Sequence, residues 1–285
     1  MKKRKSPASG GFNRKSGRAA ADSGIALAEG EPFLEVRQLT LQYKTARYLI
    51  TATRDVSFDV RESDRLILLG PSGCGKSTIL KAIGGFLKPA GGSITLNGSR
   101  IEKPGADRAI VFQEFDQLLP WKSALENIVF AIRQTRKLDR AEAVEEARGL
   151  LQKVNLGKFG DTYPHALSGG MKQRVAIARC LALKSKIILM DEPFASLDAL
   201  TRQKMQEELL ELWSETKFTL VFVTHSIDEA ITLGSRIIVL SPHPGRVVDE
   251  FSVDWTRTGT RHRLQSADLK ERITRILFKD MDYVI

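Results

Sequence analysis

The sequence lacks the long apolar run that a membrane-spanning helix needs, because no stretch of its 285 residues reaches roughly 18 to 20 consecutive apolar positions. The basic residues after Met1 are not followed by the apolar core of a secretory signal peptide. Cysteine is also scarce. Cys74 and Cys180 fall in a predicted loop and a predicted helix, which argues against a disulfide framework. These absences predict a protein that stays in the reducing cytosol.

Acidic residues are missing from the first eighteen positions, where Lys and Arg are frequent. Residues 1–30 are rich in Lys, Arg, Ser, Gly and Ala, which predicts a disordered basic tail. A solvated arm is the simplest interpretation, and an electrostatic tether to acidic lipid headgroups is the alternative. Much of the net charge of +10 lies in this tail, so it is weak support for nucleic-acid binding.

Short apolar runs alternate with helical patterns along the rest of the chain. Residues 116–165 show helical patterns without a convincing strand, so we expect an inserted helical subdomain there. Alternation of strands and helices predicts an α/β fold, and runs apolar on both faces predict a parallel-sheet core. The predicted strands cover 33–43, 54–60, 66–69, 110–112, 187–190, 219–223 and 237–240, and the predicted helices 76–86, 124–134, 140–154, 170–183 and 200–213.

A glycine-rich segment with the pattern G-x-x-x-x-G-K-[ST] follows the strand expected at 66–69 and opens the next helix. Glycines let backbone N–H groups turn toward phosphate oxygens, and the helix adds the positive end of its dipole. Lys76 is expected to pair with the β- and γ-phosphates of ATP, and Ser77 to bind Mg²⁺. The predicted nucleotide-binding residues here are Gly70, Pro71, Ser72, Gly73, Cys74, Gly75, Lys76, Ser77 and Thr78.

Two adjacent carboxylates, Asp191 and Glu192, end the apolar run at 187–190. Phosphate-loop ATPases hold Mg²⁺ with an Asp at the end of such a strand, which predicts Asp191 as a metal ligand. Glu192, the next residue in the chain, is expected to project toward the γ-phosphate and is the predicted general base for the attacking water. The pair alone would be interpreted as a solvated strand end, but the phosphate loop in the same chain favours catalysis.

A third segment, Leu167-Ser168-Gly169-Gly170, heads a predicted helix that Ser168 is suited to cap. With this signature lying between the phosphate loop and the Asp-Glu pair, the chain resembles the ATP-binding-cassette family, although Met171 stands where that signature usually has Gln. The resemblance implies an antiparallel β subdomain beside the parallel core. It also implies a head-to-tail homodimer, in which Ser168, Gly169 and Gly170 of one copy close over ATP bound to the other.

The resemblance assigns further residues to the site. Gln113 resembles the glutamine that senses Mg²⁺ and water, and is thus a predicted metal ligand and catalytic residue. His225 resembles the switch histidine that contacts the γ-phosphate, and residues 196–198 resemble the dimer-contact loop. Tyr43 resembles the aromatic residue on which adenine stacks, with Tyr48 as a competing candidate.

The segments 105–121 and 241–246 resemble ATPase subunits of importers for taurine, sulfonate and nitrate. The resemblance implies permease subunits as partners, an extracytoplasmic solute-binding protein reached through the complex, and a peripheral place on the cytoplasmic side of the inner membrane. Residues 118–121 are expected to line a groove for a helix of the channel subunit. The cassette is expected over 31–260, with a C-terminal helical extension over 261–285.

Two other classes of cassette ATPase remain as alternatives. One is the ATPase of an exporter, whose chemistry is the same. The other is a non-transport ATPase acting on nucleic acid or ribosomes, against which the short separation of Ser77 from Leu167 and the single set of motifs argue. We therefore expect no nucleic-acid partner.

Overall fold

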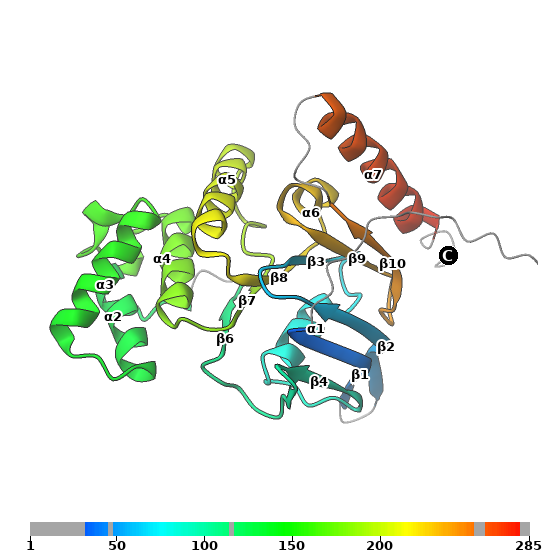
Figure 1. Cartoon of the computed structure of the whole chain (residues 1–285), viewed down its shortest axis with the longest axis horizontal. Coiled ribbons are helices and arrows are strands. Elements are labelled where there is room, and N and C mark those ends of the chain that lie inside the picture. Colours follow the sequence, from blue (N-terminus) through cyan, green and yellow to red (C-terminus); the bar gives the residue numbers. More distant parts are fainter. Residues whose placement is uncertain (1–31, 45–47, 114–116, 254–259, 280–285) are drawn as a thin grey trace, which may run out of the picture. The chain divides into compact units, whose positions relative to one another are not determined.

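The computed structural model describes residues 32–44, 48–113, 117–253 and 260–279, and in the last range side chains are described from 266 to 277. The basic tail expected over residues 1–30 lies outside the described residues. Two sheets organise the described chain (Figure 1). The antiparallel sheet has the order β2-β1-β4-β5 and consists of β1 (Leu34–Lys44), β2 (Leu49–Val60), β4 (Gly91–Leu96) and β5 (Ser99–Arg100).

The second sheet has the order β10-β9-β3-β8-β7-β6. Its strands are β3 (Arg65–Leu69), β6 (Arg108–Val111), β7 (Ile187–Asp191), β8 (Thr219–Thr224), β9 (Arg236–Leu240) and β10 (Val247–Ser252). The five strands from β9 to β6 are parallel, which confirms the predicted parallel core. The sequence did not predict β10, which pairs antiparallel with β9 at the edge of the sheet.

Side chains of β3 alternate between two hydrophobic cores, one on each face of this sheet. Leu66 and Leu68 join the core formed with α1 and the antiparallel sheet, whereas Ile67 and Leu69 join the core formed with the other helices. Both faces are therefore covered, which explains why the parallel strands are unbroken apolar runs.

Helices begin where the sequence provides capping side chains. Ser123, Asp139, Ser168, Asp198 and Ser226 each accept a hydrogen bond from a backbone N–H of the first turn that follows. The first helix ends at Ile83, earlier than predicted, because two glycines follow it. The helices are α1 (Lys76–Ile83), α2 (Ala124–Thr135), α3 (Arg140–Lys153), α4 (Gly169–Ala182), α5 (Ala199–Thr216), α6 (Ile227–Leu233) and α7 (Thr260–Lys279).

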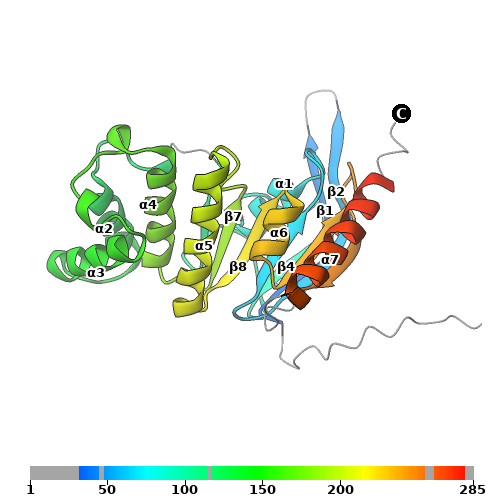
Figure 2. The same cartoon turned by 90° about the horizontal axis from the view of Figure 1, so that it is seen from above.

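The segment between β6 and β7 contains helices and short 3₁₀ turns and, among its described residues, no strand. Helices α2, α3 and α4 pack on one another, and the short 3₁₀ turns η2 (Gly157–Phe159) and η3 (Pro164–Ala166) connect α3 to α4. Figures 1 and 2 both place α2 and α3 beyond α4, on the side away from the antiparallel sheet. At the other end of the chain, α7 packs on α6, and its Ile273 is buried in the hydrophobic core that contains Ile67 and Leu69 of β3.

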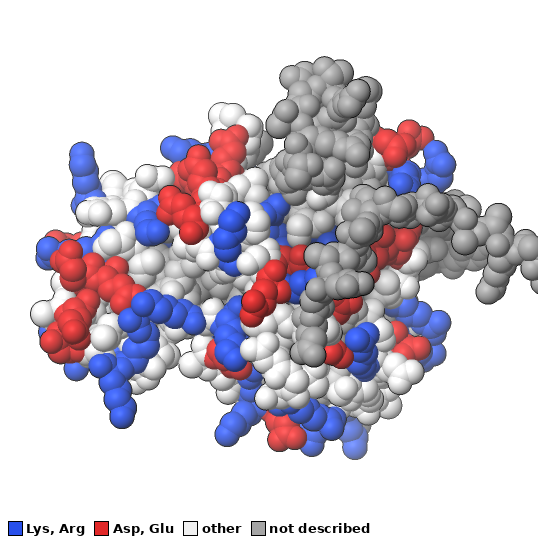
Figure 3. Space-filling view, in the orientation of Figure 1, with Lys and Arg blue, Asp and Glu red and all other residues white. Residues whose placement is uncertain are grey.

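Charged side chains of both signs are interspersed on the face shown in Figure 3. Ion pairs also join exposed side chains among the described residues, such as Arg140 with Glu126 at 2.6 Å and Lys153 with Glu215 at 3.0 Å. Exposed pairs of this kind contribute little to stability, about 0–1 kcal/mol each. The cations in these pairs are accompanied by neighbouring carboxylates.

Arg236 of β9 is nearly buried and joins the two sheets through a network of ion pairs. Its guanidinium contacts Asp64 at 3.0 Å, Asp59 at 3.4 Å and, through Nε, Glu250 at 2.8 Å. Burial alone would lower the pKa of Arg236, but the bonds and charges of Glu250, Asp64 and Asp59 raise it overall. The guanidinium therefore stays charged and is the cation shared by all three carboxylates, of which Asp64 also accepts a hydrogen bond from Arg61 N at 3.0 Å.

We expect Arg236→Met to lower the free energy of unfolding by about 2–3 kcal/mol, below the roughly 3–5 kcal/mol for a fully buried pair because Asp59 and Glu250 are partly exposed. Urea unfolding of the full chain without nucleotide measures this. Arg37→Met is the matched control, since its pair with Glu35 is exposed and 3.1 Å long. Equal losses in the two variants would contradict a special role of the Arg236 network.

Candidate functional site

The glycine-rich loop of residues 70–75 connects β3 to α1, as predicted. Gly75 is the N-cap of α1 and has a φ of +98°, in the region that favours glycine. A Cβ on Gly75 would also lie 2.5 Å from Cγ2 of Thr53, so no larger residue fits without movement. No side chain caps α1, which leaves the first N–H groups of the helix for an anion. The loop therefore has the features of a phosphate cradle.

Lys76 is buried at the start of α1 and folds back on this loop. Its Nζ donates hydrogen bonds to the carbonyl oxygens of Gly70 at 2.8 Å and Pro71 at 3.0 Å. The same ammonium lies 3.9 Å from Oε1 of Glu192. These acceptors hold the cation inside the loop, where a phosphate group would compete for it.

Two of the predicted metal ligands are in direct contact. Ser77 Oγ donates a 2.7 Å hydrogen bond to Oδ1 of Asp191, the last residue of β7. Burial raises the pKa of Asp191, and the bond from Ser77 opposes this only in part. Mg²⁺ prefers oxygen ligands and keeps sites for water and phosphate, so a hydroxyl beside a carboxylate fits this ion. Gln113 lies two residues after β6, the parallel neighbour of β7, and is exposed at the same edge of the sheet.

Glu192 stands between a cation and an imidazole. Its Oε2 is 2.8 Å from Nδ1 of His225, which follows β8 and is half-exposed. Its backbone has a φ of +43°, a strained conformation for a residue other than glycine that costs about 1–3 kcal/mol. A hydrogen bond of 3.1 Å from its N–H to the carbonyl of Val223 holds this conformation. Such strain is typical of functional residues. This backbone conformation places the carboxylate between Lys76 and His225.

Tyr43 contacts the helix that follows the phosphate loop. Its hydroxyl lies 3.1 Å from Oγ1 of Thr78, and its ring is 39% exposed. Tyr48, the residue before β2, is 71% exposed. The hairpin tip between them, residues 45–47, lies outside the described residues. The contact with Thr78 favours Tyr43 as the residue beside a bound base.

The signature segment lies away from the phosphate loop of its own chain. Ser168 is exposed and caps α4, and its Oγ accepts a hydrogen bond from Met171 N at 3.3 Å. Figures 1 and 2 both place α4 on the opposite side of α5 and β7 from α1. A Cβ on Gly170 would lie 3.3 Å from Thr201, whose N–H is capped by Asp198 of the predicted dimer-contact loop. The structure thus joins the signature to residues 196–198 and not to its own loop.

Gln117 ties the segment after β6 to α4, a link that sequence reasoning missed. Its side-chain amide accepts from Phe112 N at 3.2 Å and donates to Phe112 O at 3.1 Å and to Gln173 at 3.3 Å. Arg179 of α4 donates to the carbonyl of Gln117 at 2.7 Å. Phe112, the residue before Gln113, is therefore linked through Gln117 to the helix carrying the signature.

Glu229 is a second missed residue, buried behind His225. Its carboxylate accepts hydrogen bonds from Gln206 of α5, at 3.0 Å, and from Thr224 of β8. Burial raises the pKa of Glu229 despite these bonds. In the sequence, Ser226 and Glu229 have the spacing of an ordinary capping box, which predicts an exposed carboxylate. Only the fold shows that this carboxylate anchors the segment of His225.

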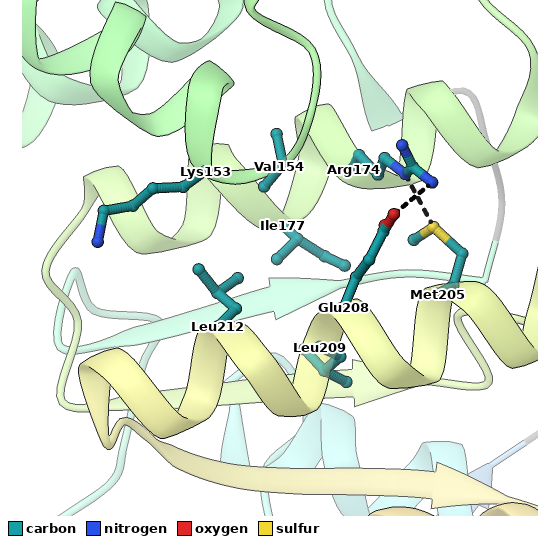
Figure 4. A pocket seen from close by; sticks show the side chains of 8 residues that line it. All are labelled: Lys153, Val154, Arg174, Ile177, Met205, Glu208, Leu209 and Leu212. Atoms are coloured by element: carbon teal, nitrogen blue, oxygen red, sulfur yellow. Dashed lines mark hydrogen bonds and ion pairs between the residues drawn. The ribbon is translucent and has the colours of Figure 1, made fainter.

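A small hollow between α3, α4 and α5 lies outside this site (Figure 4). Within it, Arg174 of α4 forms a 2.9 Å ion pair with Glu208 of α5, and its Nε lies 3.2 Å from Sδ of Met205. Most of the other lining side chains are apolar. The ion pair links α4 to α5, and the hollow does not have the features of a phosphate site. The full lining is Lys153, Val154, Arg174, Ile177, Met205, Glu208, Leu209 and Leu212.

Comparison with known proteins agrees with this geometry. The sequence pattern of the ABC transporter family matches residues 53–195, half of the chain. The taurine import ATP-binding protein TauB of Rhizobium johnstonii is 47% identical over 247 residues, covering 83% of this chain and 94% of that protein. An uncharacterized ABC transporter ATP-binding protein, MJ0412 of Methanocaldococcus jannaschii, is 41% identical over 244 residues, covering 86% and 91%.

Among solved structures, the ATP-binding cassette MJ0796 in a dimeric post-hydrolysis state with ADP and Pi superposes with a TM-score of 0.68 at 32% identity, covering 78% of this chain and 99% of that one. The family match over residues 53–195 includes the phosphate loop, the signature segment and the Asp-Glu pair. The chain therefore belongs to the ABC transporter family and is one of its ATPases.

Proposed function

We propose that this ATPase drives an importer for a small anionic or zwitterionic solute, with taurine as the first candidate and sulfonate or nitrate as the others. The observation that carries the proposal is the 47% identity to a taurine import ATP-binding protein, over 83% of this chain and 94% of that protein. The grouping of catalytic residues within one chain supports it, because the phosphate loop, Asp191, Glu192 and His225 meet at one edge of the sheet.

ATP is the proposed nucleotide, held with its triphosphate on residues 70–78 and its base against Tyr43. Lys76 would exchange the carbonyl oxygens of Gly70 and Pro71 for phosphate oxygens. Mg²⁺, when bound by Ser77, Asp191 and Gln113, would neutralise part of the phosphate charge. These residues bind and orient ATP and do not themselves take part in proton transfer.

Glu192 is the proposed general base. Its carboxylate would take a proton from water as the water oxygen bonds to the γ-phosphorus and the bond to the β-phosphate oxygen breaks, releasing ADP and phosphate. His225, 2.8 Å away, would hold the carboxylate and contact the γ-phosphate. Glu229 would position His225 through Thr224, without touching the nucleotide.

Two copies of the chain would complete the site. Helix α4, which begins with the signature residues Ser168, Gly169 and Gly170, lies apart from α1, which follows the phosphate loop, and this supports a head-to-tail dimer in which the signature residues cap ATP on the partner (Figures 1 and 2). None of the helices in the described ranges combines the length and the apolar character that crossing a bilayer requires.

Separate permease subunits would form the channel, with this chain peripheral on the cytoplasmic side of the inner membrane. A solute-binding protein would join through the complex. Trp121 is 70% exposed and remains a candidate for the permease contact, but Leu118 is buried in the core and cannot line a groove as the sequence predicted. The interspersed charges on the face shown in Figure 3 give no support to a nucleic-acid partner there.

A pull-down of the tagged full chain from gently solubilised membranes tests the proposal. We expect a multi-spanning membrane protein and a solute-binding protein to be recovered with it. In proteoliposomes containing the recovered complex, taurine with the binding protein should raise ATP hydrolysis, and nitrate should not. Stimulation by nitrate or an alkanesulfonate, without stimulation by taurine, would contradict taurine as the substrate. Recovery of ribosomes or DNA-repair proteins in place of the membrane protein and the solute-binding protein would contradict transport.

A further inference from the structure

The turn at residues 241–246, which joins β9 to β10, folds against the back of the phosphate loop. Ser241 closes the turn, since its N–H donates to the carbonyl of Arg246 at 2.9 Å and its Oγ accepts from Arg246 N at 3.1 Å. Gly245 is buried inside it. None of the roles assigned above uses this turn, although it is built from bonds that fix its shape.

Gly245 meets the phosphate loop at closer range than any side chain would allow. A Cβ at this position would lie 2.0 Å from the carbonyl oxygen of Cys74. The residue before the turn also meets the loop, because a Cβ on Gly70 would lie 3.0 Å from the carbonyl oxygen of Leu240. The atoms in the way are backbone atoms, which cannot rotate aside as a side chain can.

Gly245 also joins the turn to β2 of the other sheet. Its N–H donates to Ala52 O at 3.0 Å, and its carbonyl accepts from Arg54 N at 3.0 Å. Strand β2 pairs with β1, which carries Tyr43, and Thr53 of β2 packs on Gly75. One glycine therefore contacts both the loop proposed to hold the phosphates and the strand pair proposed to hold the base.

We propose that Gly245 is a positioning residue for nucleotide binding: it sets the place of the Cys74 carbonyl, and with it the phosphate loop, relative to the hairpin that carries Tyr43. The proposal rests on the ATP site described above. Gly245 itself does not reach the nucleotide. Its φ does not lie in the left-handed region, so alanine at this position changes only the space available and not the backbone preference.

Gly245→Ala is expected to raise the KM and Kd for ATP about tenfold, because overpacking against a backbone group costs about 1–3 kcal/mol and shifts the loop. The kcat at saturating ATP should stay within about twofold, since Glu192 and His225 are untouched. Equilibrium binding of ATP and steady-state hydrolysis by the full chain measure both. If the role of Gly245 were merely structural, Gly245→Ala would lower the thermal midpoint measured without ATP but leave the Kd for ATP unchanged. An unchanged Kd for ATP would overturn the proposal.

Gly149→Ala is the matched control, because a Cβ on this glycine of α3 would have no atom within 4 Å. We expect its ATP affinity to equal that of the unmodified chain. If the unmodified chain itself fails to bind ATP, the failure contradicts the proposed ATP site and not the role of the turn.

A second measurement keeps the proposal testable if Gly245→Ala does not fold. Coupling between two sites is reciprocal, so ATP binding should slow hydrogen exchange at the amides of Gly245 and Arg54 in the unmodified chain. The amide of Gly149 serves as the reference. Equal exchange at Gly245 and Arg54 with and without ATP would overturn the proposal.

Discussion

Glu192→Gln is expected to leave ATP binding intact while hydrolysis falls by about a hundred- to ten-thousand-fold, the usual contribution of a general base. The amide has the shape of the carboxylate but cannot accept a proton from water at neutral pH. It also removes the negative charge 3.9 Å from Lys76, so that the ammonium is freer to pair with phosphate. ATP affinity should therefore be unchanged or higher.

Single-turnover hydrolysis and equilibrium binding, measured on the same preparation, separate these two effects. Glu145→Gln, on the exposed surface of α3, is the matched control and should hydrolyse ATP at the normal rate. Normal hydrolysis by Glu192→Gln would remove Glu192 from the role of base. Loss of binding together with hydrolysis would instead indicate that its carboxylate organises the loop.

The parts of the fold that could be predicted from the sequence are those whose signal is local. Strands β7 and β8 are covered on both faces, so each is an unbroken apolar run and was predicted within one residue of its bounds. In contrast, the sequence of β10 is neither an unbroken apolar run nor a strict alternation of apolar and polar residues, because Asp249 and Glu250 follow Val247 and Val248, and α6 has only seven residues, too few for a helical period to show. Their formation depends on pairing with β9 and packing on the sheet.

The same distinction holds for the candidate site. The phosphate loop and the Asp-Glu pair were found because their chemistry lies in consecutive residues. Gly245 could not be found, since its role depends on Cys74 and Ala52, which lie far earlier in the chain. Glu229 was missed because a capping serine three residues before it predicts a surface carboxylate, whereas packing of α5 against α6 buries it.

Lys76→Ala is expected to weaken ATP binding at least tenfold and to abolish measurable hydrolysis. Each hydrogen bond to a charged group contributes about 1.5–3 kcal/mol, and the loss of one to the phosphates corresponds to about tenfold or more in affinity. The variant also leaves the carbonyl oxygens of Gly70 and Pro71 without their donor and Glu192 without its cation, so the loop is less well fixed before ATP arrives.

The shift of the thermal midpoint by ATP measures the loss of binding, because a ligand at concentration L stabilises the folded chain by RT ln(1 + L/Kd), which at a fixed ATP concentration falls as the Kd rises. Lys88→Ala, an exposed lysine shortly after α1, is the control and should keep the full shift. A normal shift in Lys76→Ala would mean that the ammonium serves only to close the empty loop. In that case the backbone amides and the helix dipole would hold the phosphates without it.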